Sequence, residues 1–425
     1  MRELEKLTAV EAVRLIAAGE ITSVALVEAC LARIAEREPH VLAWAHSDRE
    51  AALARAREID RSGAHGLLAG VPIAVKDVID TADMPTQYNS PIYRGYRPRA
   101  DAACVALARR EGAVVLGKTV TTEFASRVAG PTRNPHDPAH TPGGSSSGTA
   151  ASIADFMVPC GFGTQTGGSV IRPAAYCGVV GYKPTFGTIN GAGMKHLSES
   201  LDTIGVMGRA VADCALLVHA VSSRKLPDFG TAPPVPRIGL CRTSRANDAL
   251  PETHAALERA AAALSARGAK VRELALPAHF DRLYDEQTVI SGFEAARALA
   301  WEMNAHPDGL SDYMREHIPE YLKIPHAEYV EALRHARECR AEFAAVTAGL
   351  DVLLTPSAPG YAPKGLESTG SALFNRNWTT LHVPCVTVPA PREGGALPLG
   401  LQLVGRHDED ERVLVAAEWV RRALA

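Results

Sequence analysis

The sequence predicts an α/β fold, in which one large domain is built around a central mixed β-sheet with helices on both faces. In the first half of the chain, short apolar runs that have the length of buried strands alternate with helical segments. Apolar runs return after a long, charged helical stretch, and we expect them to complete the same sheet. With 425 residues, of which 46% are hydrophobic, the chain can bury a large core.

The N-terminal part is expected to be helical and to lead into a buried strand. Thr8 and Glu11 have the spacing of a capping box, which predicts a helix start. A second helix follows, with an apolar face formed by Val24, Val27, Leu31 and Ile34. Residues 50–60 are predicted to form a third, solvent-facing helix. The apolar run 71–80 predicts a buried strand with Lys76 near its C-terminal end.

The next elements are predicted by alternating apolar runs and turn residues. We expect helices over 101–112 and 147–155, strands over 113–119 and 157–163, and a short helix after Arg172 and Pro173. Residues 130–144, rich in Pro, Asn, Asp and Gly, predict a loop.

The second half completes the predicted domain. Residues 225–235 resemble a linker, and residues from about 250 to 350 are mainly helical and charged. Strands are expected over 237–242, 351–359, 384–390 and 399–405. We therefore predict one domain over 1–425, with a helical N-terminal segment (about 1–60), a core (about 66–215), a helical middle (about 250–350) and a sheet-completing end (about 351–425).

Composition excludes several classes of function. The formal net charge is −3 and no long basic run occurs, so nucleic-acid binding is not expected. The charged N-terminus lacks the apolar core of a secretory signal, and no apolar stretch reaches the ~18–20 residues that span a bilayer. A cytoplasmic protein without membrane contact is predicted. The eight cysteines are scattered and are expected to be reduced, mostly buried thiols.

Two serine-glycine turns and one lysine carry the expected chemistry. The turns are GGSSSG (143–148) and GTQTGGSVIRP (163–173), and Lys76 ends an apolar run upstream of both. A hydroxyl nucleophile needs a base that takes its proton and donors that hold the oxyanion. The second turn offers a serine with adjacent backbone N–H groups, while Lys76 and the first turn can supply the base. This combination predicts an acyl-transfer site.

Three other patterns are not expected to be functional. Residues 112–119 match the P-loop pattern, but the residues between its glycines are Ala-Val-Val-Leu, which predict a strand, and Lys118 is expected to be structural. Ser146 occupies the centre of a GxSxG pattern that no strand precedes. His136 and His140 have helical zinc-ligand spacing, but the prolines around them argue against a helix. No metal and no cofactor are expected.

The chain resembles the amidase signature hydrolases over nearly its whole length. The matching segments are VPIAVKD (71–77), PGGSSSG (142–148), GTQTGGSVIRPAAYCGVVGYKPT (163–185), SLDTIGVMGR (200–209) and PLGLQLVG (398–405). Within the family, the version TQTGGSVIRPAAYCG and residues 81–102 resemble the malonamidase branch. The chain has Gln165 where the family more often has Asp, and Arg172 lies three residues after Ser169 rather than two.

The resemblance implies roles for these residues. Ser169 would be the nucleophile, Ser145 the relay and Lys76 the base, with a cis peptide bond between Gly144 and Ser145. The N–H groups of Thr166, Gly167, Gly168 and Ser169 would form the oxyanion hole. Thr164, Gln165 and Arg172 are expected to bind substrate, Arg172 as a carboxylate clamp, although it could instead only support the nucleophile turn.

The chemistry also predicts the environment of Lys76. To act as a base near pH 7, Lys76 needs a pKa about three units below that of a free lysine, and burial among apolar groups can lower the pKa by this amount. Asp77 would oppose this fall in pKa, but neighbours on a strand point to opposite faces.

The predicted activity is hydrolysis of a small carboxylate-bearing amide such as malonamate, with release of ammonia. Hydrolysis of an aryl, indole or carbamoyl amide is one alternative, and the role of a glutaminase-type component of an amidotransferase is another. Only 5% of the residues are aromatic, so we expect few aromatic side chains to line a cavity for flat substrates. The predicted partner is a small-molecule amide, and the family suggests a homodimer.

Overall fold

The computed structural model describes residues 3–63, 65–230, 232–392 and 394–425. Within these residues, eleven strands form one mixed sheet in the order β1-β3-β2-β4-β6-β5-β10-β11-β9-β7-β8. The strands are β1 (Trp44–Ser47), β2 (Pro72–Lys76), β3 (Val114–Thr119), β4 (Cys160–Gln165), β5 (Val180–Lys183), β6 (Thr203–Gly208), β7 (Arg237–Leu240), β8 (Lys270–Glu273), β9 (Val352–Pro356), β10 (Cys385–Pro389) and β11 (Gly400–Val404).

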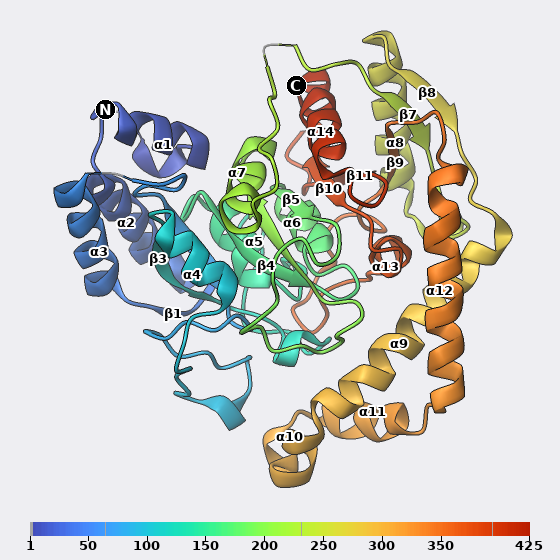
Figure 1. Cartoon of the computed structure of the whole chain (residues 1–425), viewed down its shortest axis with the longest axis horizontal. Helices are drawn as coiled ribbons and strands as arrows, with labels where there is room; N and C mark the ends of the chain where they lie inside the picture. The colour runs from blue at the N-terminus through green and yellow to red at the C-terminus, as the bar shows by residue number, and fades with distance from the viewer. Residues whose placement is uncertain (1–2, 64, 231, 393) are drawn as a thin grey trace.

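Helices surround this sheet (Figure 1). They are α1 (Ala9–Ala17), α2 (Ser23–Val41), α3 (Arg49–Ser62), α4 (Ala103–Arg110), α5 (Ser147–Ala154), α6 (Ile171–Cys177), α7 (Val211–Ser222), α8 (Pro251–Ala266), α9 (Leu283–Ala298), α10 (Ala300–Ala305), α11 (Asp312–Leu322), α12 (His326–Val346), α13 (Leu373–Thr380) and α14 (Asp410–Leu424). Short 3₁₀ turns lie at Leu4–Lys6, Pro91–Tyr93, Glu123–Ala125, Ala246–Asp248, Ala278–Arg282 and Pro307–Gly309.

The sheet brings both ends of the chain into one domain, as predicted. Strands β2, β3 and β4 are parallel neighbours, and antiparallel pairs continue the sheet through β6, β5, β10 and β11 to β9. Helices α5 and α6 pack together against the sheet, and α7 packs beside α14 in a second group. The late strands are thus hydrogen-bonded into the sheet that the first half begins, which confirms the single-domain α/β fold.

Most predicted elements are present, with shifted ends. The capping box at Thr8 and Glu11 begins α1, and Lys76 is the last residue of β2. Strand β4 begins at Cys160, later than predicted, and extends to Gln165. Strands β1, β5, β6 and β8 were not predicted; β8 interrupts the segment that was expected to be mainly helical.

Helices α9 to α12 form an arm at the lower right of Figure 1, beside the sheet. Helix α9 packs against both α11 and α12. The arm is held to the core by Glu302, whose carboxylate lies 2.6 Å from Lys195 Nζ and accepts from the Tyr93 hydroxyl. A second tie is Glu123, which accepts from the backbone N–H of Ser311 at 3.1 Å. These contacts fix the start of α11 against the core.

All eight cysteines are buried and free, as expected. None of the described helices has both the length and the apolar character needed to cross a membrane. His136 Nε2 lies 2.9 Å from the carbonyl of Cys177, and His140 pairs with Asp137, so both histidines belong to the loop. The described residues contain no group of three or more His, Cys, Asp or Glu that could hold a metal ion.

Candidate active site

Lys76 ends β2 in a fully buried position, between β3 and β4. Its Nζ lies 2.6 Å from Ser145 Oγ and 2.7 Å from Thr164 Oγ1. Burial lowers the pKa of Lys76 to about 7; the charge of Asp202 acts against this shift, and that of Arg172 adds to it. The amine is therefore substantially neutral near pH 7, and it contacts the serine of the first turn.

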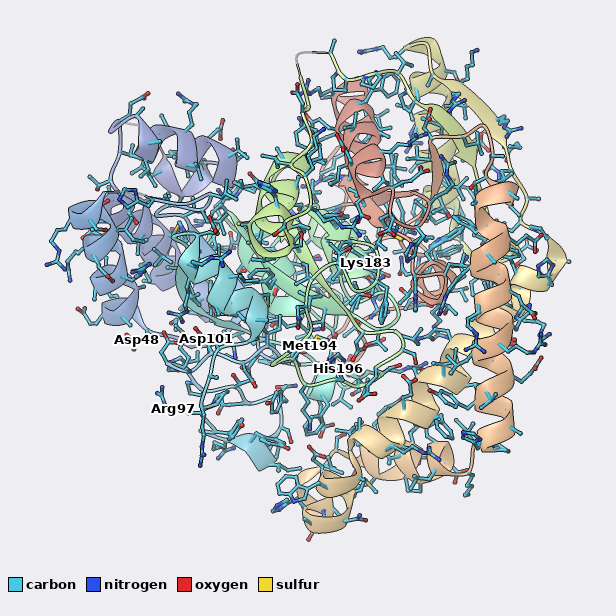
Figure 2. All side chains as sticks on the ribbon, in the orientation of Figure 1. Asp48, Arg97, Asp101, Lys183, Met194 and His196 are labelled. Atoms are coloured by element: carbon cyan, nitrogen blue, oxygen red, sulfur yellow. The ribbon has the colours of Figure 1, made fainter. Side chains whose placement is uncertain are left out.

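Two other lysines are fully buried, and each has a different partner. Lys118 forms an ion pair with Asp77 at 3.0 Å, so Asp77 faces away from Lys76, as the alternation along the strand predicts. Lys183 lies near the centre of the molecule (Figure 2), where its Nζ donates to the carbonyl of Pro184 at 2.9 Å. Burial lowers the pKa of all three lysines, but among them only Lys76 contacts a hydroxyl of the serine turns, that of Ser145.

The first serine turn is fixed by its backbone. The peptide bond between Gly144 and Ser145 is cis, as the family resemblance implied. Arg172 Nη2 donates to the carbonyl of Gly144 at 2.6 Å. A Cβ at Gly144 would lie 2.6 Å from Cγ2 of Thr369, so a larger residue there would displace Thr369, which accepts from Arg172. These contacts hold the Ser145 hydroxyl against Lys76.

The turn from Thr166 to Ser169 presents its N–H groups without partners. All four carbonyls accept hydrogen bonds: Gln287 Nε2 donates to Thr166, Thr379 Oγ1 to Gly167, and the N–H groups of Arg172 and Ser146 to Gly168 and Ser169. Within the described chain, none of the four N–H groups donates to a protein acceptor. Free N–H groups beside a serine are what an oxyanion hole requires.

Ser169 is the serine that a ligand can reach. It is 7% exposed and lines a cavity of about 560 Å³, whereas Ser145 is 1% exposed. The two turns are adjacent, since the N–H of Ser146 donates to the carbonyl of Ser169 at 3.3 Å. The hydroxyls of Ser145 and Ser169 are not hydrogen-bonded to each other in the described structure. Contacts of this kind commonly tighten only when substrate binds.

Thr164 and Gln165, expected to bind substrate, are not among the residues that line the cavity. The Thr164 hydroxyl contacts Lys76. The Gln165 Oε1 accepts from the N–H groups of Val170 and Ile171, and its Nε2 donates to Thr379 Oγ1. Gln165 is fully buried and braces the start of α6, so the geometry favours a positioning role for both residues.

Arg172 lines the cavity, but its guanidinium is already engaged. Its Nη1 donates to the carbonyl of Gly370, and its Nη2 donates to the carbonyl of Gly144 and to Thr369 Oγ1. A two-pronged contact with a carboxylate uses Nη2 together with Nη1 or Nε, and both Nη2 hydrogens are donated here. These contacts favour support of the serine turns over the predicted clamp.

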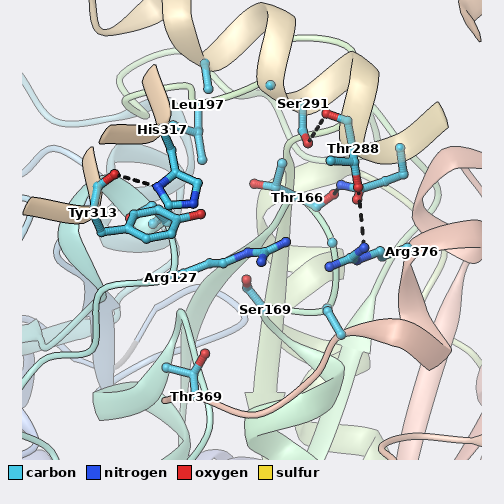
Figure 3. A pocket seen from close by; sticks show the side chains of 18 of the residues that line it. Arg127, Thr166, Ser169, Leu197, Thr288, Ser291, Tyr313, His317, Thr369 and Arg376 are labelled. Atoms are coloured by element: carbon cyan, nitrogen blue, oxygen red, sulfur yellow. Dashed lines mark hydrogen bonds between the residues drawn. The ribbon is translucent and has the colours of Figure 1, made fainter. Parts of the chain in front are cut away.

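The cavity has an aromatic wall that the composition did not predict. Helix α11 contributes Tyr313, His317 and Tyr321, and the rings of Tyr313 and His317 are stacked with centroids 4.0 Å apart (Figure 3). The low aromatic content therefore does not exclude a flat group in the substrate.

Two further arginines, Arg127 and Arg376, line the cavity and were missed by sequence reasoning. Arg376 is on α13 and Arg127 follows the 3₁₀ turn Glu123–Ala125. Neither lies in a serine turn, and a single arginine in a loop or a short helix gives no signal that would identify it.

Known proteins give a consistent identification of the class. The model of the Amidase family matches residues 25–414. The chain is 35% identical to a glutamyl-tRNA(Gln) amidotransferase component from Chloroflexus aggregans, over 99% of this chain and 97% of that protein. It resembles a crystal structure of an amidase with a TM-score of 0.90 and 30% identity, covering 99% of this chain and 100% of the other.

A second similar structure belongs to a vestigial protein complex that reveals the evolutionary origins of an s-triazine catabolic enzyme. Its TM-score is 0.90 at 27% identity, with 98% of each chain covered. The fold and the comparisons define a hydrolase of amide C–N bonds. The chain belongs to the amidase signature family. The particular likeness to malonamidases stays a prediction.

Proposed function

We propose that this protein is a serine amidohydrolase that releases ammonia from a small amide through an acyl-enzyme at Ser169. The observation that carries the proposal is the contact of 2.6 Å between Lys76 Nζ and Ser145 Oγ, made by a lysine whose pKa is lowered to about 7. A base with a pKa near the working pH combines the correct protonation state with a useful driving force for proton transfer.

Acylation follows from this arrangement. Neutral Lys76 accepts the proton of Ser145, and Ser145 accepts that of Ser169 as Ser169 Oγ attacks the amide carbon. The free N–H groups of the Thr166–Ser169 turn donate to the oxyanion that forms. The proton returns through Ser145 to the amide nitrogen, the C–N bond breaks, and ammonia leaves.

Deacylation uses the same groups. A water molecule attacks the ester carbon of the acyl-enzyme and gives its proton to the Ser145–Lys76 pair. The same N–H groups hold the second oxyanion, and Ser169 recovers its proton as the acid departs. The side chains of Lys76, Ser145 and Ser169 carry every proton transfer in both half-reactions, and the N–H groups only stabilise the oxyanions.

Malonamate represents the substrate class that we favour, an amide with a free carboxylate. The described residues that line the cavity include three arginines (Arg127, Arg172 and Arg376) and one carboxylate, that of Glu367. A surplus of positive charge suits an acid amide.

The glutaminase-type component of an amidotransferase is the second candidate. The 35% identity to a glutamyl-tRNA(Gln) amidotransferase component over nearly the whole chain supports it more directly than any comparison supports malonamate. Glutamine carries an ammonium group besides its carboxylate, and that group would need an acidic partner. Glu367 is the one carboxylate among the described residues that line the cavity, against three arginines, so the cavity favours an amide without an ammonium group.

The test is ammonia release by the purified protein from malonamate, succinamate, glutamine, propionamide, benzamide and a carbamoyl amide. We expect malonamate or succinamate to be hydrolysed with the highest kcat/KM, and Ser169 to be labelled by a fluorophosphonate. Glutamine as the best substrate would instead support the amidotransferase role. The hydrolase proposal fails if no amide releases ammonia and no label is incorporated.

The pH dependence of the reaction tests the base. Protonated Lys76 cannot accept a proton, so kcat/KM for an uncharged amide should fall as the pH drops through about 7, approaching tenfold per pH unit below it. The measurement is kcat/KM for propionamide between pH 5 and 9. A profile that is flat down to pH 5 would show that lysine is not the base.

A further inference from the structure

We propose that Arg127 and Arg376 together hold the carboxylate of the substrate, so that the enzyme selects amides that carry an acid group beyond the scissile carbonyl. We call these two residues the arginine pair. The inference deepens the proposed function and rests on it, since it assumes that the amide carbonyl of the ligand lies at Ser169.

The arginine pair is placed over the nucleophile from two sides. Figure 3 shows the two guanidinium groups pointing toward each other above Ser169, although the residues come from segments far apart in the sequence. A Cβ built at Gly167 would lie 3.9 Å from Cγ of Arg376. The aliphatic part of Arg376 therefore lies beside the turn Thr166–Ser169, which we call the oxyanion turn. A short acid amide with its carbonyl at this turn would direct its carboxylate toward the pair.

Neither charge of the pair is compensated by an ion pair. In the part of the chain that the structure describes, no carboxylate lies within 4 Å of the guanidinium of Arg127 or Arg376. Arg376 has one weak polar contact, 3.4 Å from Nη1 to Thr288 Oγ1. Arg127 is exposed and Arg376 is half-buried, so water screens part of their repulsion, and an anion bound between them would offset the rest.

The electrostatics of Arg376 agree with this geometry. Burial lowers the pKa of Arg376, and the charge of Arg127 lowers it further, while Tyr321, Asp285 and Tyr313 act in the opposite direction. Burial lowers the pKa of Arg172 to about 10, and the charges of Arg376 and Arg127 lower it further, while Tyr176 acts in the opposite direction. The charges of the three arginines therefore act on one another in the cavity, and a bound carboxylate would offset their repulsion.

The hydrogen-bonding capacity of the pair distinguishes it from Arg172. Arg172 donates three hydrogen bonds to protein oxygens, whereas Arg127 makes none that the described structure records and Arg376 makes one. Guanidinium binds carboxylate through two parallel N–H bonds, which requires neighbouring free donors. The arginine pair retains these donors, and they face the cavity.

The test compares amides that differ in the carboxylate. Wild type and the variants Arg127→Gln and Arg376→Gln are assayed with malonamate and propionamide, and with succinamate and butyramide. We expect the ratio of kcat/KM values, acid amide over neutral amide, to exceed one in wild type and to fall roughly 10- to 100-fold in each variant, the loss typical of a charge-assisted hydrogen bond. Arg376→Lys should recover only part of the ratio.

Two control variants separate specificity from structure. Arg133 is exposed and does not line the cavity, so Arg133→Gln should leave the ratio unchanged. Arg172→Ala should lower kcat/KM for acid and neutral amides alike, because it removes the support of the Gly144 and Gly370 carbonyls. Unchanged ratios in both arginine-pair variants would overturn the inference, as would a fall in the ratio in Arg172→Ala alone.

A binding measurement makes the inference independent of turnover. Malonate should slow fluorophosphonate labelling of wild type, and protection should require roughly tenfold more malonate in Arg127→Gln and Arg376→Gln. Inorganic phosphate serves as the comparison anion, and stronger protection by phosphate than by malonate would contradict a carboxylate subsite. If wild type hydrolyses no amide yet binds malonate by calorimetry and the variants do not, the proposed function fails and the subsite stands.

Discussion

Replacing Ser169 with alanine is expected to lower kcat by roughly four orders of magnitude or more, which is the largest single effect predicted for this protein. The side chain is 7% exposed at the floor of the cavity, and its removal leaves the oxyanion turn and the proton path in place without a nucleophile. The measurements are ammonia release and fluorophosphonate labelling, and both should be lost. Folding should be unaffected, since the change deletes one hydroxyl.

Ser147→Ala is the matched control in the neighbouring turn. The Ser147 hydroxyl donates to the carbonyl of Val120 and is not part of the cavity, so the variant should be labelled and remain active. A Ser169→Ala protein that still forms an acyl-enzyme would disprove the assignment. The cysteines nearest in sequence offer no substitute, because burial raises the pKa of both the Cys160 and the Cys177 thiols above the ordinary value.

The predicted fold depended on signals that are local in the sequence. An apolar run of strand length located β2 and β3, and the spacing of Thr8 and Glu11 located the start of α1. Strands β5 and β6 were missed because they are short or contain glycine, which disfavours isolated strands. Their strand conformation comes from pairing with β4 and β10, which no short window of sequence reveals.

The candidate site likewise contains residues that sequence signals revealed and residues whose role they did not reveal. Lys76, Ser145 and Ser169 could be found because two serine-glycine turns and a buried lysine are unusual in combination. Gln165 and Arg172 were expected to bind substrate because of the family resemblance and, for Arg172, because guanidinium suits a carboxylate, yet their side chains are hydrogen-bonded to protein groups.

The arginine pair was not found from the sequence. Arg127 and Arg376 are far from Ser169 in sequence, and only the packing of α13 and of the loop after Glu123–Ala125 brings them to the cavity. Recognisable motifs therefore located the nucleophile and its base, whereas the arginine pair, which lies in no motif, required the tertiary structure.

Loss of the base is expected to have the second-largest effect. Lys76→Met keeps most of the volume of a fully buried side chain and removes the amine, so kcat/KM should fall roughly 10³- to 10⁴-fold. Ser145→Ala should cause a similar loss, because it breaks the path between Lys76 and Ser169. Lys183→Met is the matched control: this lysine is equally buried but donates to the Pro184 carbonyl, and the variant should retain activity if it folds.

The double variant Lys76→Met/Ser145→Ala tests whether the two residues act as one unit. If the proton of Ser169 passes through Ser145 to Lys76, removing either residue interrupts the whole path, and removing both should cost less than about tenfold beyond the worse single variant. The measurement is kcat/KM for propionamide, with circular dichroism to establish folding. Losses that multiply would mean that Lys76 and Ser145 contribute independently. Lys76 would then act by its charge or by packing against Thr164, and the hydroxyl of Ser169 would need another route for its proton.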